Sequence, residues 1–93
     1  MATTIQQQVR DYIRENFLMG AQDLEFGDAD SLLDRHIVDS TGILELEIFV
    51  ERAFGIEVRD EDVVPENFDS VSKLASYIRR KQKAARVAGT QMA

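Results

Sequence analysis

Three consecutive residues, Asp39, Ser40 and Thr41, carry the clearest chemical potential in this sequence. They stand where a long connection turns into a segment with helical apolar spacing. A serine at that point has its hydroxyl beside the unpaired N–H groups of a first helical turn, which form a favourable place for a phosphate group. The simpler interpretation is that Ser40 only caps the helix, a role that serine and aspartate fill in very many helices. Taken alone, the three residues favour the simpler interpretation.

Other catalytic or metal-binding chemistry has little support in the sequence. His36 is the single histidine, and the chain has no cysteine. A triad of Ser40, His36 and Asp39 is not favoured, because Asp39 and Ser40 are neighbours on one backbone and no third group orients His36. The acidic stretch that begins at Asp28 fails as an EF-hand loop, because Leu33 stands where the turn glycine belongs. We therefore expect that the chain is not itself an enzyme, and only loose cation binding stays open.

The composition is that of an ordinary globular domain with an uneven charge. Of the 93 residues, 44% are hydrophobic and 30% charged, which suits one domain with a modest core. No apolar run approaches a membrane-spanning length and the N-terminus lacks the features of a signal peptide, so we expect a cytoplasmic protein. Residues 1–78 hold all 17 acidic residues but 6 of the 11 basic ones, giving −11, whereas residues 79–93 carry +5. We expect the acidic part to repel nucleic acids and anionic membranes and to attract basic partner surfaces.

Apolar residues at helical spacing predict a first helix over about Thr4–Phe17. Thr4 can cap this helix, with Gln7 three residues on as its capping-box partner. The expected core stripe consists of Ile5, Val9, Tyr12, Ile13 and Phe17. A long connection from Gly20 to Asp39 follows, and a connection of this length in a small domain is usually functional or held by its own apolar residues. The expected anchors are Leu24, Phe26, Leu32, Leu33, Ile37 and Val38.

A second helix is predicted over about Ser40–Phe54, ending at Gly55. The segment Ile56–Val58 is expected to be extended, and Asp60–Val63 to form a brief helical turn before Pro65.

A last helix follows, capped by Asp69 or Ser70. Its apolar positions at i, i+3, i+4 and i+7 are Val71, Leu74, Ala75 and Ile78. Beyond about Lys83 the residues become small and polar, so we expect a basic, frayed tail over residues 84–93. The predicted fold is all-α, a four-helix bundle with three main helices and one short helix, whose domain covers residues 1–83.

The order of these features resembles the acyl carrier protein family over about residues 5–82. An Asp-Ser pair alone is a weak signal, but the whole ordered set has the spacing that the family shows. The set consists of Asp39-Ser40 opening the second helix, Gly55 closing it, the extended Ile56-Glu57-Val58, the acidic turn Asp60-Glu61-Asp62, and Pro65-Glu66-Asn67-Phe68-Asp69-Ser70-Val71 leading into the last helix.

The resemblance implies a covalent cofactor, a 4′-phosphopantetheine arm attached to Ser40 through a phosphodiester. Its thiol would carry an acyl or aminoacyl group as a thioester, which supplies the thiol that the cysteine-free chain lacks. The phosphate would lie at the positive end of the second helix, and Asp39 would flank it as a contact for the modifying enzyme or its metal. The implied partners are a phosphopantetheinyl transferase, an AMP-forming acyl or aminoacyl ligase and downstream acyl-using enzymes. Nucleic acid and membrane are not implied, and a monomer is expected.

The second helix is also the expected partner surface. Its inward side is predicted to consist of Ile43, Leu46, Phe49, Val50 and Ala53. A neighbouring outward stripe consists of Thr41, Leu44, Glu45, Ile48 and Arg52, with Glu51 beside it. Exposed apolar residues edged by acids suit the basic, apolar groove of a partner. Without the resemblance, the simpler interpretation is that Glu45, Glu47 and Glu51 only solvate a surface.

Four positions depart from the members of the family that serve fatty-acid synthesis. Ile37 and Thr41 stand where glycine and leucine usually flank the serine, Arg52 replaces an acid, and Phe49 replaces a small residue. These departures favour a free-standing carrier in specialised biosynthesis. We expect the ring of Phe49 to fill the interior, so that a thioester cargo stays outside the helices. The alternatives are an acidic helical interaction module without a prosthetic group and a fragment of a multidomain synthase, which is disfavoured because a methionine stands close before the first helix.

Overall fold

Four α-helices and one 3₁₀ turn follow one another in the part of the chain that the structure describes, and this part contains no strand. The computed structural model describes the backbone of residues 4–18 and 25–92 and the side chains of residues 4–18 and 25–85. The elements, in order, are α1 (Ile5–Phe17), α2 (Ser40–Phe54), η1 (Asp60–Asp62), α3 (Pro65–Phe68) and α4 (Val71–Met92). The predicted all-α fold, with a long loop between the first two helices, is confirmed.

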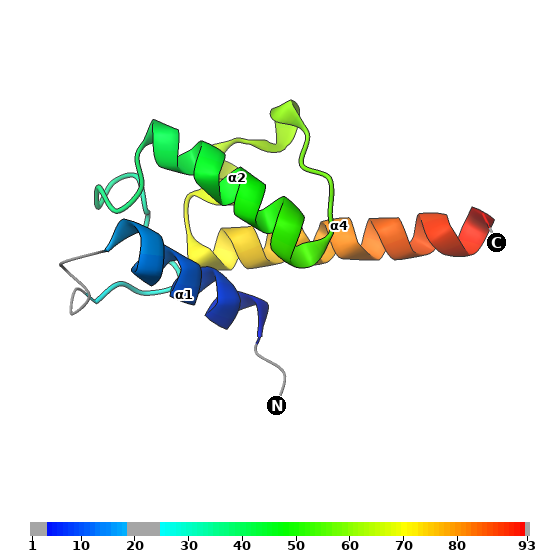
Figure 1. Cartoon of the computed structure of the whole chain (residues 1–93), viewed down its shortest axis with the longest axis horizontal. Helices are drawn as coiled ribbons and strands as arrows, with labels where there is room; N and C mark the ends of the chain where they lie inside the picture. The colour runs from blue at the N-terminus through cyan, green and yellow to red at the C-terminus, as the bar shows by residue number, and fades with distance from the viewer. Residues whose placement is uncertain (1–3, 19–24, 93) are drawn as a thin grey trace.

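The last helix, α4, is the element against which the others pack. It contacts α1, α2 and α3, and Figure 1 shows its final turns projecting past the other helices. Its predicted apolar positions are all buried, as are the central residues of the other two main helices, Val9 and Ile13 of α1 and Leu46 and Val50 of α2. Burial of this shared core is the main favourable term that holds the three main helices together. No helix of the described residues has the length and apolar character needed to cross a membrane.

The N-cap of α1 and the C-cap of α2 lie where the sequence predicts them. Thr4 Oγ1 accepts a hydrogen bond from Gln7 N at 3.1 Å. The Gln7 side chain turns away and donates to Asp11 Oδ1 at 2.8 Å, so the capping box is only half formed. At the end of α2, Gly55 adopts a left-handed conformation with φ 64°, which a residue without a side chain reaches at little cost.

The connection before α2 is held by its own apolar residues, as predicted. Phe26, Leu32, Ile37 and Val38 are buried, and Leu33 is partly buried. Leu24 lies outside the described residues. The described part of this loop, residues 25–39, therefore has a defined path into the start of α2.

The region between α2 and α4 holds one element more than the sequence predicts. The turn at Asp60–Asp62 is the 3₁₀ turn η1, as expected, but the short helix α3 was not foreseen. Pro65 is the first residue of α3, where its missing N–H costs nothing and its fixed φ favours a helix. Between the two candidates for the α4 cap, Ser70 takes the role, because its Oγ accepts from Lys73 N at 3.1 Å.

The predicted frayed tail is wrong for the backbone, since α4 continues to Met92. Ala84 and Ala85 are strong helix formers and no proline interrupts the segment, so the helix has no local reason to end at Lys83. Ala84 and Ala85 are exposed. The extension lies outside the core at these two positions. That the rest of the tail does not join the core stays a prediction.

Candidate functional site

The start of α2 presents a serine hydroxyl that has no structural task. Asp39 is the N-cap, with extended backbone (φ −103°, ψ −174°), and its Oδ1 accepts from Gly42 N at 2.8 Å. Ser40 is the first residue of the helix, so the simpler interpretation of Ser40 as the cap is wrong. Its side chain is exposed, and its hydroxyl makes no hydrogen bond with the described residues. The cap comes from the preceding carboxylate, which leaves the hydroxyl available for chemistry.

The backbone at the start of α2 keeps two N–H groups available beside that hydroxyl. Gly42 N is taken by the Asp39 side chain, and Ile43 N donates to Asp39 O at 3.0 Å. The N–H groups of Ser40 and Thr41 have no acceptor among the described residues, as is normal for a first helical turn. Two free donors at the positive end of a 15-residue helix can receive the oxygens of an anion.

A relay of hydrogen bonds from Asp69 positions the loop that leads to Ser40. Asp69 Oδ1 accepts from Leu33 N at 2.9 Å and its Oδ2 from the Ser31 hydroxyl at 2.6 Å. Its backbone oxygen accepts from Leu32 N at 2.7 Å. The Leu32 oxygen in turn accepts from the N–H groups of the two buried residues that precede Asp39. The sequence identifies Asp69 only as a possible cap, because contacts with residues this far away in the chain leave no local signal.

The acidic residues of the stretch that begins at Asp28 have structural partners. Asp28 pairs with Arg10, and Asp30 accepts from Gly27 N at 2.7 Å and from Arg35 at 2.8 Å. The Gly27 hydrogen bond, followed by that of Arg35, holds the pKa of Asp30 below its usual value. The described residues contain no group of three or more ligands that could hold a metal ion.

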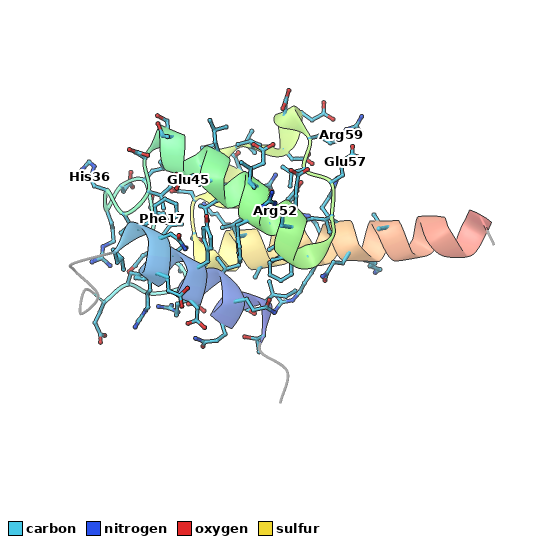
Figure 2. The ribbon with its side chains drawn as sticks, in the orientation of Figure 1. Phe17, His36, Glu45, Arg52, Glu57 and Arg59 are labelled. Carbon is cyan, nitrogen blue, oxygen red and sulfur yellow. The ribbon has the colours of Figure 1, made fainter. Side chains whose placement is uncertain are left out.

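His36 does not complete a catalytic group. It is exposed, has a positive φ of 58° and lies beside the start of α2, as Figure 2 shows. No hydrogen bond joins it to Ser40 or Asp39 among the described residues. A nucleophile–base pair is thus not formed.

An apolar groove opens directly beside Ser40. It has a volume of about 270 Å³, just below the usual range of small-molecule sites. One side is formed by α2 and the other by residues 63–69, which follow η1 and include α3, with the loop before α2 at one end. The lining residues are Leu33, Ser40, Ile43, Leu44, Val63, Val64, Pro65, Phe68 and Asp69. The sequence suggested no such groove, because its two sides come from separate parts of the chain.

The outward side of α2 exposes apolar side chains, as predicted. Leu44 is 57% exposed and Ile48 53%, and they are the large hydrophobic residues that stand out as exposed in the described part of the chain. Thr41 and Glu45 are exposed beside them. Figure 2 shows Glu45 and Arg52 on the visible face of α2. These five residues of the predicted stripe are therefore available to a partner.

Glu51 differs from the rest of the predicted partner surface. It is only partly exposed, and its Oε2 accepts from Val58 N at 3.1 Å, which fastens the extended segment to α2. Glu51 thus has a structural task that Glu45 lacks. On the same helix, partial burial and the charges of Glu51 and Asp60 raise the pKa of Glu47.

The predicted inward side of α2 needs one correction, at Ala53. Leu46 and Val50 are buried, Ile43 is partly buried, but Ala53 is exposed. Phe49 faces α1, where its ring stacks on Tyr12 with centroids 4.0 Å apart. It does not line the groove beside Ser40. Its partly buried ring therefore packs in the interior, as predicted, but toward α1, and the groove lies on the other flank of α2. The position of a cargo stays a prediction.

Comparison with models of known protein families and with curated proteins found no match for this chain.

Proposed function

We propose that this chain is a carrier protein that receives a 4′-phosphopantetheine arm on Ser40 and transports an acyl or aminoacyl group as a thioester. The observation that carries the proposal is the exposed, unpartnered Ser40 hydroxyl at the first position of α2. Asp39 takes over the capping role that would otherwise explain a serine here. In this proposal the protein is not an enzyme and acts in the cytoplasm.

The residues at the start of α2 fit the group. The free N–H groups of Ser40 and Thr41 would receive the phosphodiester oxygens at the positive end of the helix. Asp39, turned toward Gly42, would be a contact for the modifying transferase or its metal. The arm supplies the thiol that forms the thioester, and the chain supplies the attachment point and its orientation.

The α2 face gives such a carrier a surface for its partners. Leu44 and Ile48 offer exposed apolar area, and Glu45 adds negative charge next to them. A transferase, an AMP-forming ligase or a downstream enzyme with a basic, apolar groove would match this face. The departures at Ile37 and Thr41 favour a role in specialised biosynthesis.

The test is intact-mass measurement after incubation with coenzyme A, Mg²⁺ and a broad-specificity phosphopantetheinyl transferase. The wild-type chain should gain one phosphopantetheine group, and Ser40→Ala should gain none while keeping its helical circular dichroism. Ser76→Ala is the matched control, because Ser76 is also an exposed serine but lies on α4, and it should be modified like the wild type.

Two results would contradict the proposal. Modification that persists in Ser40→Ala, or that maps to another serine by peptide mass spectrometry, would remove Ser40 as the attachment site. A wild-type chain that no transferase modifies would favour the alternative, an acidic interaction module that uses the exposed Leu44 and Ile48 without a prosthetic group.

A further inference from the structure

The far wall of the groove beside Ser40 is a single segment, residues 62–69, which we call the strap. It contributes Val63, Val64, Pro65 and Phe68 to the groove. The backbone N–H groups of Val63 and Val64 donate to Asp60 O and Asp62 O, so they bond within or next to the strap. Among the described residues, no hydrogen bond joins the strap to α2. The strap is therefore held in place by its two ends and by side-chain packing, without a direct hydrogen bond to the helix that carries Ser40.

One end of the strap is fixed firmly. Asp69 holds the loop before α2 through both carboxylate oxygens and its backbone oxygen, as described above. Phe68 is 1% exposed and Ser70, which follows the strap and caps α4, is 2% exposed. This end of the strap is buried in the core and is hydrogen-bonded to the loop that positions Ser40.

The other end is attached to α4 mainly by one hydrogen bond. Tyr77 OH donates to Asp62 Oδ2 at 2.7 Å, and we call this bond the latch. Lys81 Nζ also donates to the same oxygen, at a longer distance of 3.4 Å, and forms an ion pair with it. A third tie, from Arg80 to Asn67 Oδ1 at 2.8 Å, is solvent-exposed and so contributes less. A nearly buried phenol bound to a carboxylate is the stronger link, because hydrogen bonds to charged groups are worth more than neutral ones.

We propose that the strap is a gate for the groove beside Ser40, which opens at its Asp62 end and pivots at its Asp69 end, and that the bond between Tyr77 and Asp62 is the latch. Opening in this direction widens the apolar groove and leaves the bonds from Asp69 to the loop intact, so Ser40 keeps its position. The use of this gate to admit a cargo carried by Ser40 rests on the proposed function. The role of the bond between Tyr77 and Asp62 as a latch does not rest on the proposed function.

The experiment measures amide hydrogen exchange of the unmodified chain, which reports local opening directly. Tyr77→Phe removes the hydroxyl but keeps the ring that packs against Phe68, with centroids 5.6 Å apart. The amides of the strap should exchange at least about tenfold faster, since the bond lost involves a charged acceptor. Amides in α1 and α2 should keep their wild-type rates. Tyr12→Phe is the matched control, because its hydroxyl makes only a long 3.5 Å bond to Glu45 O on the other flank of α2.

A double variant separates the latch from general destabilisation. Tyr77→Phe combined with Asp62→Ala should exchange no faster in the strap than Asp62→Ala alone, since both remove the same bond. Three results would overturn the latch. They are additive effects of the two substitutions on the exchange rates of the strap, unchanged strap rates in Tyr77→Phe, and an equal increase in the exchange rates of α1 and α2.

With an octanoyl group on the arm at Ser40, NMR shifts at Val63 and Val64 should be larger in Tyr77→Phe than in the wild type. Equal shifts would overturn the use of the gate for cargo. The exchange result is obtained without the arm, so it stands or falls separately from the proposed function.

Discussion

Asp39 has two possible tasks, and a pair of substitutions separates them. Its Oδ1 accepts from Gly42 N at 2.8 Å, which caps α2, and its negative charge stands at the positive end of that helix. Asp39→Asn keeps an acceptor oxygen on a side chain of the same shape and loses the charge. Asp39→Ala loses both. The difference between the two variants therefore measures the capping bond, and the difference between Asn and the wild type measures the charge.

The expected magnitudes follow from these two contributions. Loss of an N-cap acceptor costs about 1 kcal/mol, within a range of about 0.5–2. An exposed charge at a helix N-terminus contributes about 0.3–1 kcal/mol at low ionic strength. In a domain of this size, 1 kcal/mol corresponds to about 4–8 °C in Tm. Asp39→Ala should thus lower Tm by about 4–8 °C or more, and Asp39→Asn by a smaller amount that added salt removes. Thermal circular dichroism at low and high salt measures both.

The same pair tests the functional task of Asp39. Under the proposed function, Asp39→Asn should slow the transferase reaction at Ser40 although the helix remains capped. Equal Tm values for the Asn and Ala variants would refute the capping role inferred from the 2.8 Å bond. An unchanged modification rate in Asp39→Asn would leave Asp39 as a cap alone. Mass spectrometry over a time course gives the rate in both cases.

Four other changes have outcomes that the structure specifies. Glu45→Lys should slow loading by a basic partner without unfolding the chain, because reversing an exposed charge mainly lowers the association rate, and equal loading rates at low salt would speak against a steering role. Gly42→Ala should lower the urea midpoint, because the new Cβ would lie 2.8 Å and 2.9 Å from two neighbouring side-chain carbons. Its overpacking cost of about 1–3 kcal/mol exceeds a helix-propensity gain of about 1 kcal/mol, and a raised midpoint would contradict this. Deleting residues 84–93 should leave Tm nearly unchanged, and a large drop would reveal a contact of the extension with the core. The Tyr77 hydroxyl lowers the pKa of Asp62, so the resulting stability is present above the unfolded-state pKa of about 3.9 and is lost as pH falls through the folded-state value. Urea titrations across the acid range should therefore show a smaller loss of stability in Tyr77→Phe than in the wild type.

Local sequence signals predicted the main helices because each signal acts within a few residues. The cap at Thr4, the left-handed Gly55 and the apolar spacing of α4 all depend on near neighbours, and all have the expected structure. The four-residue helix α3 is too short for a repeating apolar pattern, and its one local signal is Pro65, which favours a helix at the first helical position. The end of α4 was misplaced because polarity was given more weight than the helix propensity of alanine.

Side chains that bond across the fold could not be assigned from the sequence. Asp69 reaches residues 36 and 38 positions away, and Glu51 bonds the backbone of Val58 instead of facing a partner. An exposed acid on a helix and an acid that fastens a neighbouring segment look the same in a sequence. The tasks of Glu45 and Glu51 differ only because the chain after Gly55 brings Val58 N to the side chain of Glu51.

The position of Phe49 shows how a small difference in helical angle changes a functional expectation. Sequence spacing predicts that its ring fills the interior, so that a cargo stays outside the helices. In the fold it lies toward α1 and stacks on Tyr12, whereas Ile43 and Leu44 face the groove. The side chains of one helical turn point toward different neighbouring elements. A residue of α2 can therefore be partly buried without lining the groove beside Ser40. Under the proposed function, the room for a cargo is therefore decided by the strap and its latch at Tyr77, and substitution of Phe49 should affect packing against α1 instead.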